Sequence, residues 1–144
     1  MLFKKRIFSK EQEEKLICAI QIAEKNTSGE IRVHFDSKAS DAPIERAKEV
    51  FKNLKMHETK LRNGILFYVN LKHHEFAIWG DEGINNKVPA NFWDEIKNTA
   101  IEHFKKEEII PGLEKCILMC GEQLKMYFPL QDGDKNELSN EISY

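Results

Sequence analysis

Residues 65–69 of this chain read Ile-Leu-Phe-Tyr-Val, an unbroken run of apolar side chains. Side chains of a β-strand alternate between its two faces, so this run is fully buried only if both faces are covered. Helices on both sides of a sheet provide such cover. A chain of 144 residues is long enough for one domain of this kind and too short for two.

Two further segments predict strands beside this run. In segment 29–36, apolar and polar side chains alternate, which is typical of a half-buried strand. The apolar members are Ile31, Val33 and Phe35, and the polar members are Arg32, His34 and Asp36. Segment 75–80 follows the apolar run after the short connection 71–74, so the two form an antiparallel hairpin.

Apolar residues at helical spacing predict four helices, over residues 9–26, 41–54, 91–104 and 111–128. Ser9 with Gln12 forms a capping-box pattern, Asp41 is a candidate cap, and Pro43 and Pro111 suit first turns. The resulting order predicts an α/β protein, a three-layer α/β/α sandwich with a small mixed sheet. One parallel crossover and one antiparallel hairpin make up that sheet, and about four helices flank it.

We expect residues 1–129 to form a single domain and residues 130–144 to be an acidic, disordered tail, because the tail has no apolar period. Its acidic residues are Asp132, Asp134, Glu137 and Glu141. Segment 132–137 resembles the start of an EF-hand loop. That motif requires glycine at its sixth position and glutamate at its twelfth, where this chain has Glu137 and Ser143, so we expect a solvated tail.

Composition narrows the classes of function. A net charge of −2, without a basic patch, argues against a nucleic-acid partner. No segment approaches the roughly 18–20 apolar residues of a membrane span, and the first ten residues do not resemble a secretory signal. The three cysteines lie within helical patterns and suit reduced thiols better than disulfides. We therefore expect a cytoplasmic protein.

The predicted topology brings three turns to one edge of the sheet. Parallel strands begin at the same edge, and the antiparallel third strand ends there. The turns are 27–30 (Thr-Ser-Gly-Glu), 62–64 (Arg-Asn-Gly) and 80–83 (Gly-Asp-Glu-Gly), and we name this edge the turn rim.

The turn rim offers oxygen ligands for a hard divalent cation such as Ca²⁺ or Mg²⁺. We predict Asp81 and Glu82 as its main ligands, with Glu30 and Asn63 as further contributors. Clustered carboxylates repel one another, and a bound cation, a neighbouring arginine or a raised pKa has to relieve that repulsion.

Arg62 would orient one of these carboxylates or contact an anionic ligand, while Gly80 and Gly83 would permit close approach of the backbone. The competing interpretation is a plain turn followed by carboxylates at a helix start, where the helix dipole favours them. Arg62 would then pair with one of the acids only to hold the turn.

The polar side chains of segment 29–36 form a second candidate site. Arg32, His34 and Asp36 point to the same side of their strand. If that side faces water, they form the normal outer surface of an edge strand. If a helix covers it, they must be paired, and His34 becomes a group that titrates near neutral pH.

Six stretches, in their order and spacing, resemble the TPM domain over roughly residues 5–129. They are TSGEIRVHF, RNGILFYV, FAIWGDEGIN, FW, HF and YFP. The resemblance implies an α/β/α sandwich. A chloroplast member of that family is linked to photosystem II repair, with acid phosphatase activity and calcium binding ascribed to it, and other members are membrane-tethered accessory proteins. The matching positions at the turn rim are Gly29–Glu30, Asn63–Gly64, Gly80–Asp81 and Gly83.

Three functional hypotheses follow. The first is binding of a divalent cation or a small anionic ligand at the turn rim. The second is a protein-interaction module that docks a partner on a sheet edge or helix face without catalysis. The third is a weak metal-dependent acid phosphatase with a cation at Asp81 and Glu82, since the chain has neither a cysteine-phosphatase loop nor a GxxxxGK loop.

Overall fold

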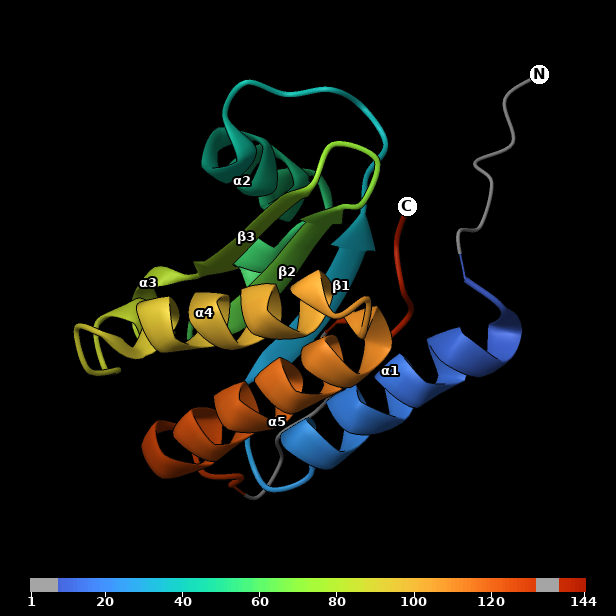
Figure 1. Ribbon diagram of the computed structural model, residues 1–144. Helices are drawn as coiled ribbons and strands as arrows, with labels where there is room; N and C mark the ends of the chain where they lie inside the picture. The colour runs from blue at the N-terminus through green and yellow to red at the C-terminus, as the bar shows by residue number, and fades with distance from the viewer. Residues whose placement is uncertain (1–7, 132–137) are drawn as a thin grey trace.

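The computed structural model describes residues 8–131 and 138–144 and contains the predicted elements in the predicted order (Figure 1). A one-turn 3₁₀ helix, η1, and a one-turn helix, α3, are added to them. The elements are α1 (Lys10–Glu24), β1 (Glu30–Phe35), α2 (Pro43–Asn53), η1 (Met56–Glu58), β2 (Gly64–Asn70), β3 (Glu75–Gly80), α3 (Glu82–Asn85), α4 (Phe92–Lys105) and α5 (Ile109–Tyr127).

The helix ends follow local signals with two differences. Ser9 and Gln12 form the predicted capping box at the start of α1. Helix α2 is preceded by Ala42 rather than by the expected cap Asp41, and no side chain caps it. Helix α5 begins at Ile109, so Pro111 lies within its first turn rather than opening it.

The sheet has the order β1-β2-β3. Strands β1 and β2 are parallel, with Glu30 opposite Gly64, and β2 and β3 are antiparallel, with Ile65 opposite Gly80. This is the predicted mixed sheet. Every residue of the central strand β2 is buried, as its unbroken apolar run requires.

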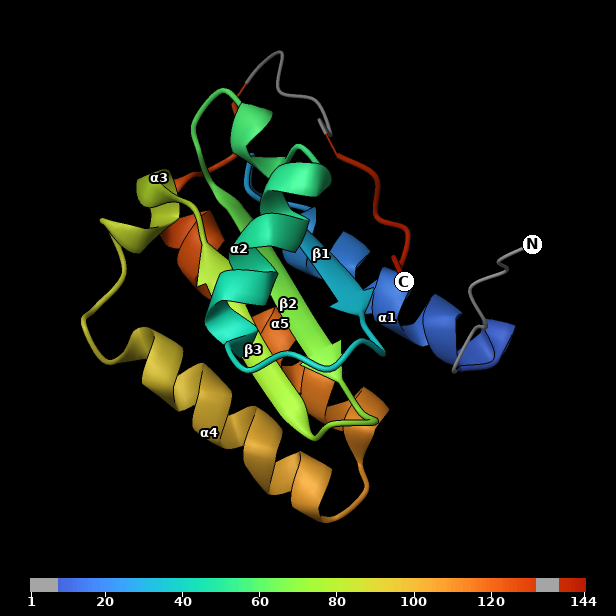
Figure 2. The ribbon, with the colours of Figure 1, turned by 90° about the horizontal axis from the view of Figure 1, so that it is seen from above.

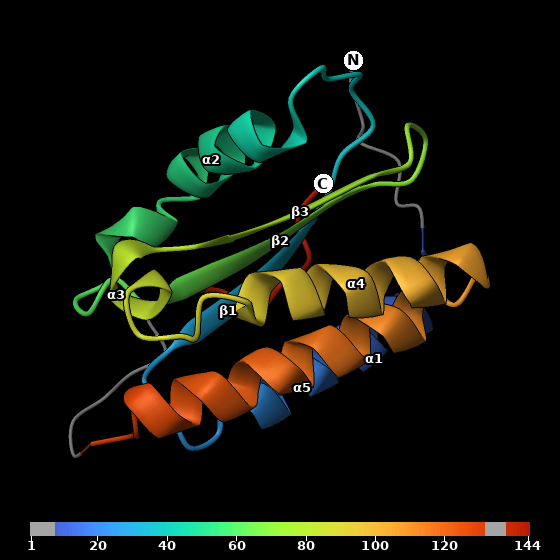
Figure 3. The same cartoon turned by 60° about the vertical axis from the view of Figure 1, so that its left-hand side comes forward.

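Helices cover both faces of the sheet (Figure 3). One core joins α1, α4 and α5 to the face of β2 that carries Ile65 and Phe67. A smaller core joins α2 and η1 to the face that carries Leu66 and Tyr68. The predicted three-layer arrangement is thus confirmed, and among the described residues no helix has the length and apolar character needed to cross a membrane.

The end of the chain lies against the outer edge of β1 (Figure 2). The Ser143 N–H donates to the Val33 carbonyl at 3.0 Å, and the Phe35 N–H donates to the Ser143 carbonyl at 2.9 Å. These bonds satisfy backbone groups that an open strand edge would leave to water. Residues 138–144 therefore differ from the mobile tail expected there, whereas the EF-hand-like segment 132–137 lies outside the described residues.

Candidate functional site

The three turns of the turn rim are joined directly by backbone hydrogen bonds. The Glu30 N–H donates to the Asn63 carbonyl at 3.3 Å, and the Asp81 N–H donates to the Gly64 carbonyl at 2.9 Å. A third bond, from the Gly83 N–H to the Arg62 carbonyl at 2.8 Å, ties the last turn to the middle one. The chain directions inferred from the sequence thus bring these segments together as expected.

Arg62 and Asp81 form the centre of the rim. The Arg62 Nε and Nη2 atoms donate to the two oxygens of Asp81 at 2.6 and 2.9 Å, which is the bidentate geometry that a guanidinium favours. Arg62 Nη1 also reaches Glu82 Oε1 at 3.3 Å. Asp81 is only 4% exposed and additionally accepts the Glu82 N–H at 2.8 Å at the start of α3. One guanidinium therefore links both acids.

A surface depression of about 350 Å³ lies beside this centre. We name it the rim depression; its polar wall consists of Lys52, His57, Arg62, Asp81, Glu82 and Asn85, next to the ring of Trp79. Within the part of the chain that the structure describes, His57 Nδ1 is buried without a hydrogen-bond partner. The rim depression thus mixes cationic and anionic side chains.

Neither Lys52 nor His57 is among the site residues that the sequence predicts. Both reach the rim depression because α2 and η1 pack against β2 and β3. No residue spacing in the sequence predicts this contact, since it depends on how the helical layer packs on the sheet.

Glu30 and Asn63 belong to the rim but do not line the depression. Asn63 is 1% exposed, and its Nδ2 atom donates to Ser28 Oγ at 3.3 Å. Glu30 is also buried, on β1, and β2 separates it from Asp81. The three turns meet, but their side chains do not converge on one point.

Gly80 and Gly83 have packing roles at the rim. A Cβ atom on Gly80 would lie 2.5 Å from the ring of Trp93, and one on Gly83 would lie 2.1 Å from the Leu61 carbonyl oxygen. Both distances are shorter than any tolerable contact. These glycines are therefore explained by close approach of neighbouring groups.

Glu24, at the end of α1, is a titratable group that the sequence did not single out. Burial raises the pKa of its carboxyl to about 8, against the effect of a hydrogen bond from the Ile31 N–H, and nearby Glu30 raises it further. Asn140 of the docked C-terminal segment also bonds to it. The group lies beside the turn rim and couples it to the end of the chain.

The second candidate site is covered, so the interpretation as an open outer surface is wrong for β1. His34 and Asp36 are buried, and His34 Nδ1 lies 2.8 Å from Ser143 Oγ. Arg32 Nε donates to the Glu141 carbonyl at 3.2 Å. Each of these side chains contacts either α2 or the C-terminal segment.

Asp36 fixes α2 to the sheet. Burial alone would raise the pKa of this carboxyl, but hydrogen bonds from Arg46, the Lys38 N–H and Tyr68 lower it to about 2. Arg46 Nε donates to Asp36 Oδ2 at 2.8 Å, and the Tyr68 hydroxyl donates to the same oxygen at 3.0 Å. Burial and this bond raise the pKa of Tyr68 to about 12. Both carboxylate oxygens of Asp36 are thus engaged in hydrogen bonds, and the cluster holds α2 against the sheet.

The residues of the rim fit a divalent cation poorly as they stand. Both oxygens of Asp81 are engaged by Arg62, and Glu82 is an exposed side chain. Among residues 8–131 and 138–144, no group of three or more histidine, cysteine or acidic side chains is placed to hold a metal ion. A cation at Asp81 would have to displace the guanidinium.

Comparison with known proteins identifies relatives of this chain. The sequence model of the TPM domain matches residues 3–123. The NMR structure of BA42 protein from the psychrophilic bacterium Bizionia argentinensis is 43% identical, with a TM-score of 0.88, and the match covers 99% of each chain. No curated protein matches the chain in sequence.

Two more distant solution NMR structures share the fold. The N-terminal domain of a protein from P. gingivalis is 20% identical with a TM-score of 0.68, over 85% of this chain and 79% of that one. The N-terminal domain of cg2496 protein from Corynebacterium glutamicum is 13% identical with a TM-score of 0.65, over 82% and 74%. The match of the family model and the likeness to BA42 protein agree: the chain belongs to the TPM domain family.

Proposed function

We propose that this protein binds a small oxyanion, such as inorganic phosphate, in the rim depression. Arg62 is the main contact, because Asp81 holds its guanidinium in a fixed orientation through two hydrogen bonds. A guanidinium has five N–H donors, and Asp81 and Glu82 engage three of them. The remaining donors are available to a planar or tetrahedral oxyanion. This held arginine is the observation that carries the proposal.

Two further side chains support an anion there. Lys52 lies on the wall of the rim depression, and its side chain is exposed. His57 Nδ1 is buried beside it without a partner among the described residues, and burial without a partner is costly for a ring nitrogen. A bound oxyanion would accept a hydrogen bond from the ring. Lys52, together with Arg62, offsets the charges of Asp81 and Glu82.

Calorimetric titration of the protein with inorganic phosphate tests the proposal. We expect the change Lys52→Gln to weaken binding about threefold, and Arg62→Lys about tenfold, because lysine keeps the charge but not the fork of donors. Lys115→Gln, at an exposed position of α5, is the matched control and should bind as the unchanged protein does. Equal affinities for all four proteins, or no heat of binding, would overturn the proposal.

A divalent cation is the second candidate ligand. The observation in its favour is that Asp81 and Glu82 both accept from one guanidinium, so the two carboxylates are near enough to share one cation. Arg62 then occupies the place that Ca²⁺ or Mg²⁺ would take.

A further variant, Arg62→Gln, separates the two candidates. If the acids can hold a cation, Arg62→Gln should bind Ca²⁺ about tenfold more tightly than the unchanged protein, since the competing internal charge is gone. The measurement is the rise in melting temperature with Ca²⁺ concentration, each variant compared with itself without Ca²⁺. An unchanged Ca²⁺ response in Arg62→Gln rules out a cation at these two acids.

A further inference from the structure

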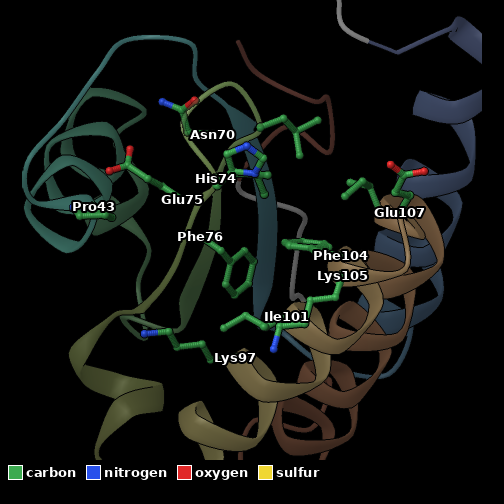
Figure 4. Close-up of a pocket in the computed structure, with 13 residues that line it drawn as sticks. Pro43, Asn70, His74, Glu75, Phe76, Lys97, Ile101, Phe104, Lys105 and Glu107 are labelled. Carbon is green, nitrogen blue, oxygen red and sulfur yellow. The ribbon is translucent and has the colours of Figure 1, made fainter.

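A larger cavity of about 710 Å³ lies at the other end of the sheet from the turn rim (Figure 4). It is formed where β2 ends and β3 begins, and the last turns of α4 and the start of α5 close it on one side. A cavity of this volume falls in the range of small-molecule sites, which is roughly 300–1,000 Å³. Nothing in the proposed oxyanion function uses it.

The centre of the cavity is apolar. The rings of Phe76 and Phe104 meet edge to face, with centroids 5.5 Å apart, and Ile101 lies beside them. Figure 4 shows these three side chains turned toward one another. All three are partly exposed, so the apolar surface they present to the cavity is only partly removed from water. An apolar ligand would bury it, at about 25 cal/mol for each Å².

Two cationic side chains accompany this apolar surface. Lys97 and Lys105 stand four residues before and four residues after Ile101, so the three share one stripe of α4. Figure 4 shows both lysines beside Ile101. Within the part of the chain that the structure describes, neither forms an ion pair. They are placed to receive a negative charge next to an apolar body.

The acidic side chains of the cavity lie at its margins. In Figure 4 the carboxylate of Glu75 is directed toward Pro43, away from the aromatic rings, and Glu107 stands at the opposite margin. His74 lies at the hairpin, with a left-handed backbone (φ 54°). The two acids thus lie toward the edges of the cavity, whereas Lys97 and Lys105 flank Ile101.

We propose that this cavity binds an amphipathic anion, a carboxylate attached to an alkyl chain or an aromatic ring. Its apolar part lies between Phe76, Ile101 and Phe104, and its carboxylate contacts Lys97 and Lys105. The site is independent of the turn rim, so each can exist without the other.

Three ten-carbon probes with different head groups test the proposal: decanoate, decan-1-ol and decylammonium. Each is titrated below its micelle concentration into ¹⁵N-labelled protein, and amide shifts are followed. Decanoate should shift residues 71–76 and 97–107, with an affinity about fivefold above that of the alcohol and further above that of the ammonium. This order of affinities is expected if the head group of the probe contacts the two lysines.

A double variant, Lys97→Gln with Lys105→Gln, should reduce the affinity for decanoate to that for decan-1-ol. The control variant, Lys115→Gln with Lys125→Gln, removes the same charge from two exposed lysines of α5. It should bind decanoate as tightly as the unchanged protein does. Equal affinities for the three probes, tightest binding of decylammonium, or shifts confined to other residues would each overturn the proposal. Loss of phosphate binding in the Arg62 variants would leave the result with decanoate unaffected.

Discussion

Replacing Gly83 with alanine is expected to destabilise the fold by about 3 kcal/mol, because the added methyl group overlaps rigid backbone. Its Cβ atom would lie 2.1 Å from the Leu61 carbonyl oxygen and 2.5 Å from the Arg62 carbonyl oxygen. Neither atom belongs to a side chain that can turn away. The overlap can be relieved only if the turn at Gly83 moves away from the turn at Arg62. The 2.8 Å hydrogen bond from the Gly83 N–H to the Arg62 carbonyl is then lost.

Urea denaturation of Gly83→Ala measures this loss, and Gly64→Ala is the control with the same chemical change. At Gly64 the nearest atom is the Met56 carbonyl oxygen at 3.3 Å, so a shift of a few tenths of an ångström suffices. We expect its cost to be about 1 kcal/mol or less. A Gly83→Ala protein as stable as the Gly64→Ala protein would show that the turns of the rim are not in contact.

Replacing Glu24 with glutamine should stabilise the protein at alkaline pH. The carboxyl of Glu24 has a pKa of about 8 in the folded protein against 4.5 for a free side chain. The folded state therefore holds a proton that the unfolded state has lost, and stability falls as pH rises from about 4.5 through about 8. Glutamine cannot ionise, and its side-chain oxygen can still accept from the Ile31 N–H.

At pH 9 we expect the Glu24→Gln protein to be more stable by on the order of 2 kcal/mol, since one pKa unit corresponds to about 1.4 kcal/mol and the carboxyl keeps part of its solvation. At pH 4 the two proteins should be equally stable. Denaturation at both pH values measures the difference, with Glu14→Gln on the exposed side of α1 as control. Parallel pH profiles of Glu24→Gln and the unchanged protein would contradict a buried carboxyl at this position.

The apolar run of β2 accounts for most of the predictable fold. Because all its residues are apolar, it must be central and covered on both faces, and the structure buries every one of them. The alternation in β1 correctly placed Ile31 and Val33 in the larger core. It left the outer edge of β1 undetermined, because the contact of Ser143 with Val33 joins residues far apart in sequence without any periodic signal.

The sequence predicted which backbone segments meet at the turn rim, but it did not predict the directions of their side chains. Chain direction alone brings the turns with Glu30, Asn63 and Asp81 to one edge of the sheet, and the hydrogen bonds between those turns agree. Chain direction does not say which way a side chain points. Asn63 bonds to Ser28, whereas Asp81 bonds to Arg62, and this difference decides which residues can share a ligand.

If Asp81 holds Arg62 as a receptor for an oxyanion, the Nε–H signal of Arg62 in ¹⁵N-labelled protein reports binding most directly. Inorganic phosphate should move that signal together with the ring signals of His57 and the side-chain amide of Asn85, in a saturable way. If phosphate leaves the Arg62 signal in place while other parts of the molecule respond, the anion binds elsewhere. The guanidinium then does no more than hold the turn.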